Sequence, residues 1–240
     1  MTIGVGYANI DRANIMGMWL MDEGSGKTVK DSSGNGNDGE IVGAELADGK
    51  YGKGLEFFGS SHVAIPQSDT TDDIMDGFTY MVWIMPTGAQ PNDNTRVIER
   101  DWHNPTIQIG ATDFYGSIAI AADQGSTNIR GGLWITDEWS FVAFTYDTEM
   151  IQLYVDGELV NEKDVGTPDS NLLGGEGAIW FGSWKAVGWD YIGILDEAAV
   201  FNVALDEDDI NDIMNTGLEK AGAVSSVGKM TATWAEVKVK

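Results

Sequence analysis

The stretch EWSFVAFTYDTEMIQLYVDGELV, residues 138–160, decides the fold class of this chain. Residues 139–146 carry bulky side chains at odd and even positions alike, which predicts a strand covered on both faces and therefore central in a sheet. Residues 150–161 are two further runs separated by Asp156-Gly157, a dipeptide that accepts the positive φ angles of a type I′ turn. The stretch predicts an antiparallel hairpin beside a central strand.

The rest of the chain repeats this pattern of short strands and turns. It contains 31 glycines but only 5 prolines, and runs rich in Val, Ile, Phe, Tyr and Trp lie between the turn signals. Amphipathic helices do not alternate with these runs, which favours two packed antiparallel sheets over a parallel α/β sheet. One short helix is predicted at Asp206 to Met214, because Asp and Glu occupy its first turn. The predicted fold class is all-β, an antiparallel two-sheet β-sandwich with one short C-terminal helix. The predicted strands are Ile15 to Met21, Gly54 to Phe58, His62 to Ile65, Phe78 to Met85, Arg96 to Arg100, Thr106 to Ala111, Ser117 to Ala121, Trp139 to Tyr146, Met150 to Val155, Glu158 to Asn161, Ala178 to Phe181 and Tyr191 to Phe201.

Composition and charge limit the partners of the chain. Its 240 residues fit one large all-β domain, and the 42% that are hydrophobic suffice for a core. Because no apolar run approaches the roughly 18 residues of a membrane span, membrane insertion is not expected. The 38 acidic against 14 basic residues give a formal charge of -24, which would repel nucleic acid and anionic lipid. An acidic surface suits divalent cations, and it equally suits a soluble protein in a salty medium.

The chain contains no cysteine, which excludes disulfides, thiolate metal sites and cysteine nucleophiles. Residues 1–13 lack the basic and apolar regions of an intact signal peptide, so we expect a lead-in from which any leader is absent. Residues 14–216 should form the sandwich. After Gly217 the composition changes to small residues and lysine, so residues 217–240 are expected to be a tail, an edge strand or a linker.

Five segments, read in chain order, carry a family pattern: MGMWLMDEGSGKTVKDSSGNGNDGEIVG, DGKYGKGLEFFGSSHVAIP, FTYMVWIMP, EWSFVAFTYDTEMIQLYVDGELV and YIGILDEAAVFNVALDEDDI. Together they resemble the bacterial laminin G-like domains of the concanavalin A-like lectin/glucanase superfamily. The resemblance runs from about Asn14 to Met214. It implies a two-sheet jelly roll, and the superfamily includes both binding modules and glycoside hydrolases, so function must be argued from the site.

Catalytic residues are not evident in the sequence. Glycoside hydrolysis needs two carboxylates about 5 to 10 Å apart across the scissile bond. The laminarinase-type enzymes of this superfamily carry Glu-x-Asp-x-Glu on one strand, a pattern that this sequence lacks. Asp196 and Glu197 are adjacent, so strand alternation predicts that they face opposite ways. His62 and His103 lie in no context typical of a nucleophile triad, and we predict a protein that is not an enzyme.

A calcium site is predicted near the N-terminal loop. Residues 31–39 are rich in Asp, Asn, Ser and Gly, and oxygen donors in a flexible loop suit Ca²⁺. The same residues are typical of Asx-turns, so a turn tract without a metal is the other interpretation. The resemblance implies a structural calcium ion held between the N-terminal strand and loop and the closing strand. Carried onto this chain, it places the ligands at Asp22 (or Glu23), in the loop with Asp31 and Asn37, and at Asp196.

Two aromatic loops form the candidate ligand surface. Residues 183–191 place three aromatic side chains among polar and small residues, and residues 100–104 place two more rings beside Arg and Asp. Sugar rings stack on aromatic side chains while neighbouring polar groups hydrogen-bond the hydroxyls. The other interpretation is that these rings cap the ends of the sandwich. The predicted ligand-binding residues are Arg100, Trp102, His103, Trp184, Trp189 and Tyr191.

These features predict a non-catalytic extracytoplasmic binding module, secreted or at the cell surface. The expected ligand is a glycan or another extracellular partner, and the negative charge favours a neutral glycan. Protein adhesion or a structural role without a glycan is the first alternative. A glycoside hydrolase with an unusual active site is the second.

Overall fold

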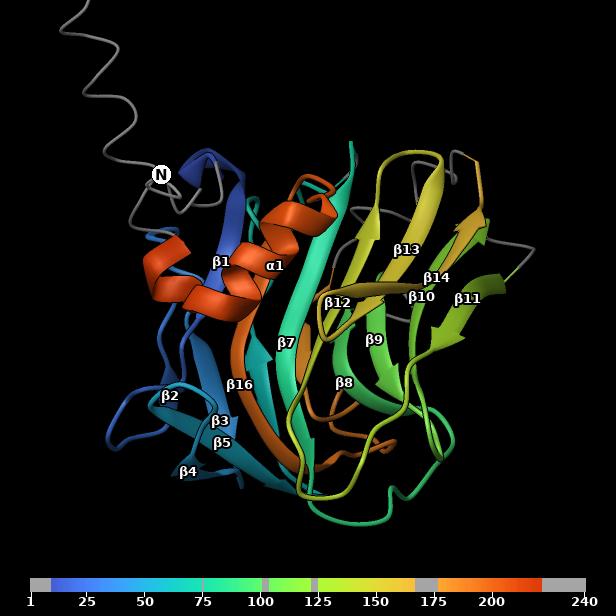
Figure 1. The fold of residues 1–240 in the computed structure, drawn as a ribbon. Helices are drawn as coiled ribbons and strands as arrows, with labels where there is room; N and C mark the ends of the chain where they lie inside the picture. Colours follow the sequence, from blue (N-terminus) through green and yellow to red (C-terminus); the bar gives the residue numbers. More distant parts are fainter. Residues whose placement is uncertain (1–9, 75, 101–103, 122–124, 167–176, 222–240) are drawn as a thin grey trace, which may run out of the picture.

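The computed structural model describes residues 10–74, 76–100, 104–121, 125–166 and 177–221. These residues form two antiparallel sheets packed face to face, with one α-helix lying across the outer face of one sheet (Figure 1). The predicted all-β sandwich with a short C-terminal helix is confirmed. None of the described helices is long and apolar enough to span a membrane.

The first sheet, sheet A, has its two longest strands at its centre. β16 pairs with β7 along one edge, while its other edge pairs with β5 in its first half and with β1 in its second half. The register of β16 against β7 shifts between Asp196 and Ala199, which marks a β-bulge. In spatial order the strands are β14 (Glu158–Asp164), β13 (Met150–Val155), β12 (Ser140–Tyr146), β7 (Phe78–Pro86), β16 (Ile192–Phe201), β5 (Lys53–Phe58) and β4 (Glu45–Asp48), with β1 (Ile15–Trp19) beside β16.

The second sheet, sheet B, is a single path of neighbouring antiparallel strands. Its inward-facing side chains include Val63, Ile107 and Phe181, which are fully buried against sheet A. In spatial order the strands are β11 (Gly125–Gly131), β10 (Phe114–Ala121), β9 (Thr106–Ile109), β8 (Thr95–Arg100), β15 (Ile179–Phe181), β6 (His62–Ile65), β3 (Gly39–Val42) and β2 (Thr28–Val29). A 3₁₀ turn at Arg12–Asn14 leads into β1 of sheet A.

The hairpin predicted from residues 138–160 forms as expected. β12 lies between β7 and β13, so its central position is confirmed. At the turn, Asp156 and Gly157 have φ angles of 52° and 84°, as a type I′ turn requires. The Asp156 carboxylate also accepts a hydrogen bond from the Phe141 N–H at 2.8 Å, which ties the turn to β12.

Two hydrophobic clusters hold the layers together. The main cluster fills the space between the sheets, and edge-to-face or tilted aromatic pairs such as Trp19 with Phe181 cross it. The second lies between sheet A and α1 (Glu207–Thr216), which buries Ile210 and Ile213. The Asp206 side chain caps α1 by accepting a hydrogen bond from the Asp209 N–H, as acidic N-caps do. Sheet A is therefore covered on both faces.

Four strands were not predicted, namely β2, β3, β4 and β11. Three of them form sheet edges, and β4 and β11 consist mainly of exposed or half-buried residues. An edge strand is held by main-chain pairing on one side, so its sequence need not show the hydrophobic alternation that identifies a strand. The packed part also extends beyond the expected limits of 14 and 216, because Ile10, Leu218 and Ala221 are buried. Residues 222–240 lie outside the described part of the chain.

Gly116 in β10 gives a test of how tightly the sheets pack. A Cβ at this position would lie 2.1 Å from the Phe144 ring of sheet A, so Gly116→Ala should lower the free energy of unfolding by about 1 to 3 kcal/mol. Gly24→Ala is the matched control, because a Cβ there meets no atom within 4 Å, and it should change stability by less than about 0.5 kcal/mol. Urea unfolding of both variants measures the difference, and equal stabilities would contradict the packing described.

Candidate functional site

The loop between β15 and β16, residues 182–191, is fixed by its own main-chain hydrogen bonds. At its base the Gly182 N–H donates to the Val97 carbonyl at 2.9 Å, and the Tyr191 N–H donates to the Gly182 carbonyl at 2.8 Å. Nearer its tip, the Trp184 N–H donates to the Gly188 carbonyl at 3.1 Å. The loop therefore has a defined shape before any ligand binds.

The same loop holds several residues in an unfavourable backbone conformation. Lys185, Ala186 and Trp189 have φ angles of 52°, 58° and 55°, a region that non-glycine residues rarely occupy. Such conformations persist where the surrounding structure imposes them, and they cluster at binding sites.

The predicted aromatic residues of this loop have different roles. Tyr191 is fully buried and its ring lies 6.1 Å from that of Phe57, so it is a core residue and does not face a ligand. The Trp184 and Trp189 rings pack edge to face at 4.9 Å, and both are half-buried. The contact between the two tryptophan rings thus stabilises the loop. Because the rings are edge to face, they do not form a flat platform.

Beside these rings the loop encloses a pocket of about 270 Å³ against the start of β6, which we call the His62 pocket. It combines polar with apolar side chains, and Val187 is exposed with 68% of its surface accessible. The His62 ring lies 5.3 Å from the Trp180 ring, so an aromatic pair borders the pocket. The lining residues are Ser60, His62, Ala186, Val187, Gly188 and Asp190.

The three polar side chains of the His62 pocket have no hydrogen-bond partner within the described part of the protein. Ser60 is exposed, and His62 and Asp190 are half-buried, yet none of them donates to or accepts from another described residue. Asp190 acts on His62 only through its charge, which raises the pKa of the imidazole against the larger lowering effect of burial. Three polar side chains that line one pocket without a partner among the described residues are available to a ligand.

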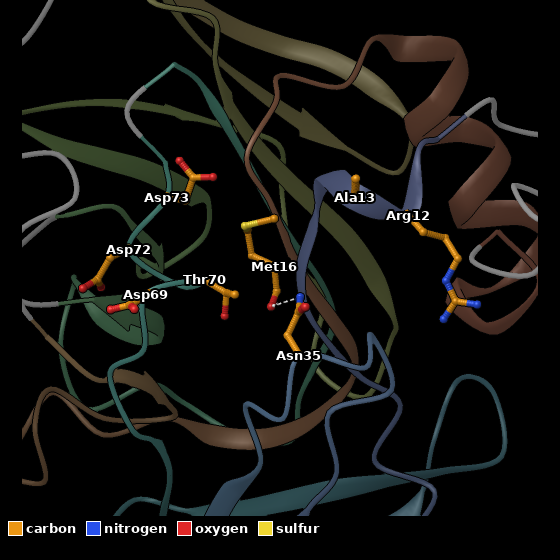
Figure 2. Close-up of a pocket in the computed structure, with 8 residues that line it drawn as sticks. All are labelled: Arg12, Ala13, Met16, Asn35, Asp69, Thr70, Asp72 and Asp73. Atoms are coloured by element: carbon orange, nitrogen blue, oxygen red, sulfur yellow. Dashed lines mark hydrogen bonds between the residues drawn. The ribbon is translucent and has the colours of Figure 1, made fainter.

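A larger cleft, of about 560 Å³, opens between the start of β1 and residues 69–73. Figure 2 shows three aspartates on one side, Arg12 and Ala13 on the other, and Met16 and Asn35 between them. Most of its polar groups are already used. Asn35 donates to the Ile15 and Met16 carbonyls, and Asp73 accepts from the Asn202 side chain at 3.1 Å.

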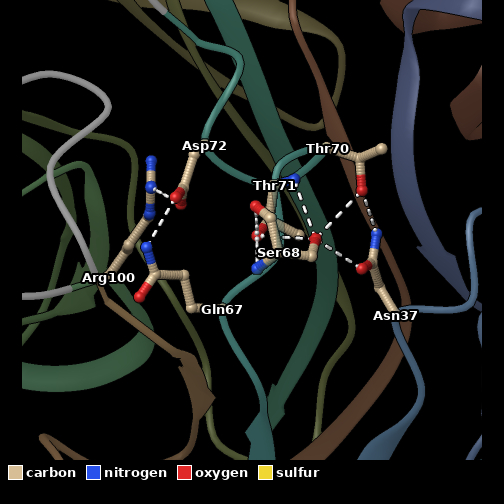
Figure 3. Close-up of polar contacts among 7 residues, drawn as sticks. All are labelled: Asn37, Gln67, Ser68, Thr70, Thr71, Asp72 and Arg100. Atoms are coloured by element: carbon tan, nitrogen blue, oxygen red, sulfur yellow. Dashed lines mark hydrogen bonds and ion pairs between the residues drawn. The ribbon is translucent and has the colours of Figure 1, made fainter.

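The wall of this cleft is a hydrogen-bonded network that joins residues 67–72 to sheet B and to the N-terminal loop (Figure 3). Ser68 donates to the Asn37 side-chain oxygen at 2.6 Å, and Asn37 donates to Thr70 at 2.9 Å. Asp72 forms an ion pair with Arg100, whose side chain is fully buried. The polar groups here stabilise the protein, so the smaller His62 pocket is the better candidate site.

This network also accounts for one of the predicted ligand residues. Arg100 lies beneath the cleft wall, where it is paired with Asp72, and it does not present its guanidinium to a ligand at the surface. Trp102 and His103 lie outside the described residues. The predicted grouping of Arg100 with Trp184 and Trp189 on one surface is therefore not what the described residues show.

The four predicted calcium ligands fall into two pairs, each with its own hydrogen bonds. The Asp31 carboxylate accepts hydrogen bonds from the N–H groups of Met18, Ser33 and Asn37, at 3.1, 2.8 and 2.9 Å. The Asn37 side chain donates to the Met16 carbonyl at 2.7 Å. These are the contacts of an Asx-turn tract, the alternative interpretation of this loop, and they tie it to β1.

The other two predicted ligands hold a different turn, residues 49–53. Asp22 accepts from the Lys53 N–H at 2.6 Å, and the fully buried Asp196 accepts from the Tyr51 N–H at 2.9 Å. Among the described residues, no group of three or more Asp, Glu, His or Cys side chains is arranged to hold a metal ion. The four residues are thus arranged as two separate pairs, and the calcium site stays a prediction.

The β-bulge in β16 corrects the prediction that Asp196 and Glu197 face opposite ways. Glu197 has a φ angle of 47°, which breaks the alternation of the strand. Its carboxylate accepts from the Leu218 N–H at 2.7 Å, and its charge adds to the burial that raises the pKa of Asp196 to about 7. Burial likewise raises the pKa of Glu197 to about 7. With exposures of 0% and 5%, neither carboxyl group is accessible to a substrate.

Sequence reasoning did not select the residues of the His62 pocket. The sequence indicates only that His62 lies in no context typical of a nucleophile triad, and its patterns do not single out Ser60, Val187 or Asp190. Residues 60–62 and the loop are far apart in the sequence, and they meet because β6 and β15 are neighbours in sheet B. The sequence feature that indicates a binding site here is the mixture of Trp, Asp, Gly and small residues in the loop itself.

Several solved structures share this fold. The binding domain of botulinum neurotoxin serotype D/C is 15% identical, with a TM-score of 0.66 over 85% of this chain and 52% of its own. The binding domain of Paraclostridial Mosquitocidal Protein 1 is 16% identical, with a TM-score of 0.66 and the same coverage. The binding domain of botulinum neurotoxin DC in complex with SialylT is 15% identical, with a TM-score of 0.64 and again the same coverage. The chain thus spans about half the length of these binding domains.

The sequence itself also matches a known family. Comparison with curated proteins found no match. Residues 57–211, more than half of the chain, match the laminin G model described as the concanavalin A-like lectin/glucanases superfamily. This match agrees with the sandwich topology and with the resemblance found in the sequence. The chain therefore belongs to the laminin G-like family of the concanavalin A-like lectin/glucanase superfamily.

Proposed function

We propose that this chain is a non-catalytic, extracytoplasmic binding module that recognises a glycan through the His62 pocket. The observation that carries the proposal is the convergence of Ser60, His62 and Asp190, none of which hydrogen-bonds within the described structure, on a pocket that also has apolar walls. Sugar recognition requires this combination, because hydroxyls need polar partners and the C–H faces of the ring need apolar ones.

The similar structures support a binding role at the level of the fold. Several are titled binding domains, one of them in complex with SialylT and another in complex with rat synaptotagmin II. The match covers 52% of the length of each of these two chains. Binding of those ligands is therefore a property of proteins longer than the matched part. The similar structures favour a binding role in general. The ligand class of this chain follows from its own pocket.

The non-catalytic part of the proposal rests on accessibility. Asp196 and Glu197 are adjacent carboxyl groups with raised pKa values, but both are buried and already accept main-chain hydrogen bonds. A general acid or base must reach the substrate within hydrogen-bonding distance. We therefore assign this pair a structural role.

Protein adhesion is the second candidate function. Leu133 and Ile135 in the loop after β11 are exposed, with 74% and 57% of their surfaces accessible, and they lie close together in the sequence. Exposed apolar side chains in one place favour contact with another protein. Leu133→Ala would weaken such a contact while leaving glycan binding unchanged.

Calcium binding stays a proposal for the predicted ligand Asp196, beside which Glu197 adds a second carboxylate. Neither carboxylate forms an ion pair in the described part of the chain, and their mutual repulsion would be relieved by a cation. A bound ion would join β16 to the turn at residues 49–53 and to Leu218, whose N–H groups these carboxylates already hold.

His62→Ala tests the glycan proposal. After a glycan array has identified a ligand, this variant should bind it about tenfold more weakly, because a hydrogen-bonding group and one ring of the aromatic border are lost. Its melting temperature should change little, since His62 is half-buried on the outer side of β6. Isothermal titration and thermal melting measure the two effects.

A pair of exposed apolar residues provides the control. Val187→Ala removes a wall of the pocket and should weaken glycan binding, whereas Leu133→Ala removes a similarly exposed side chain that lines none of the described pockets. Equal effects of the two variants would show that the glycan binds elsewhere.

The raised pKa values predict the pH dependence of stability. The folded-state pKa values of about 7 lie above the ordinary values of 3.8 and 4.5, so the folded protein binds more protons between about pH 4 and 7. In chelator, stability should therefore be largest at the acidic end of this window and fall as pH rises through 7. Thermal melts of the wild type and of Asp196→Asn measure this slope, which should be smaller in the variant.

Calcium adds a second readout to the same melts. Calcium at 100 times its dissociation constant should stabilise the folded protein by about 2.7 kcal/mol. Because it binds the ionised pair, the rise in melting temperature should be larger at pH 8 than at pH 5.5. Asp196→Asn should reduce this response. A wild-type protein that does not respond to calcium at pH 8 would remove calcium from the proposal while leaving the glycan site intact.

A further inference from the structure

The charge of the His62 pocket bears on which sugar it accepts. Asp190 is a half-buried carboxylate without a hydrogen bond or ion pair in the described part of the protein. Glu40, on the neighbouring strand β3, lies close enough to act on the His62 ring through its charge. The residues that line the pocket include neither Lys nor Arg, so its charge is negative.

The imidazole does not neutralise this charge. Burial is the largest influence on His62 and lowers its pKa, so the ring is mostly neutral at physiological pH despite the two nearby carboxylates. The one basic residue of the loop tip, Lys185, is not among the lining residues. The pocket thus offers one unpaired anionic acceptor, a neutral ring with a donor and an acceptor, and the Ser60 hydroxyl.

We propose that the His62 pocket binds a sugar unit that carries a free, protonated amino group, and that Asp190 is the specificity-determining residue. The inference rests on the proposed glycan-binding function and narrows its ligand class. The ammonium group donates to the Asp190 carboxylate, Ser60 and His62 are left for the ring hydroxyls, and Ala186 and Val187 contact the apolar face of the ring.

Charge decides between amino, neutral and acidic sugars. A hydrogen bond between ionised partners is about twice as strong as one between neutral groups, so the carboxylate favours an ammonium over a hydroxyl. A uronate would place its own carboxylate beside Asp190 and Glu40, where like charges repel. Acetylation of the amine would remove the charge and with it the preference.

The test compares methyl glycosides of glucosamine, N-acetylglucosamine, glucose and glucuronate by NMR titration at about pH 6.5, where a primary amine is protonated. The wild-type protein should bind the glucosamine derivative about tenfold more tightly than the glucose and N-acetylglucosamine derivatives, and the glucuronate derivative most weakly. In Asp190→Asn the preference should disappear, so that the glucosamine and glucose derivatives bind this variant equally tightly.

Asp76→Asn is the matched control, because it removes the same charge from an exposed residue outside the pocket. It corrects for the general attraction between a cationic sugar and a chain of charge -24. If all four sugars bind alike, or if Asp76→Asn has the effect of Asp190→Asn, the amino-sugar inference is wrong and the glycan proposal stands. If neither these sugars nor any array glycan binds, both are wrong.

Discussion

The pairing of β16 with three other strands is the constraint on which the rest of the structure depends. One edge of this strand pairs with β7, and its other edge is shared by β5 and β1. Tyr191 comes directly before it, and the burial of this side chain fixes the base of the loop that shapes the His62 pocket. The interactions that stabilise the sandwich therefore also position the candidate site, although the pocket itself lies at the surface.

The cleft of about 560 Å³ and the His62 pocket differ in what their polar groups already do. In the larger cleft, Asp72 is paired with Arg100 and Asn35 donates to main-chain carbonyls, so a ligand would have to displace contacts that stabilise the fold. In the His62 pocket, Asp190 has no hydrogen bond with another described residue. A ligand of the smaller cavity can therefore hydrogen-bond to Asp190 without displacing a contact that stabilises the fold.

The bulge in β16 shows how local backbone geometry changes the directions in which neighbouring side chains point. A regular strand would have separated Asp196 from Glu197, whereas the positive φ of Glu197 leaves both carboxyl groups buried and electrostatically coupled. Two buried carboxyl groups oppose folding once they ionise, unless hydrogen bonds or a cation compensate. The main-chain N–H groups of Tyr51 and Leu218 provide part of this compensation.

The sequence by itself determined the sandwich, most of its strands, the type I′ turn at Asp156-Gly157 and the family. These features follow from local patterns, because hydrophobic alternation and turn residues act over a few neighbouring positions. The edge strands β2, β4 and β11 escaped prediction because main-chain pairing holds them without such a pattern. Only the tertiary structure decided that Asp31 and Asp196 serve different turns, that Tyr191 is a core residue, and that Ser60 and Asp190 share a pocket. Those outcomes depend on which strands become neighbours, and strand order is set by packing between residues that are distant in the sequence.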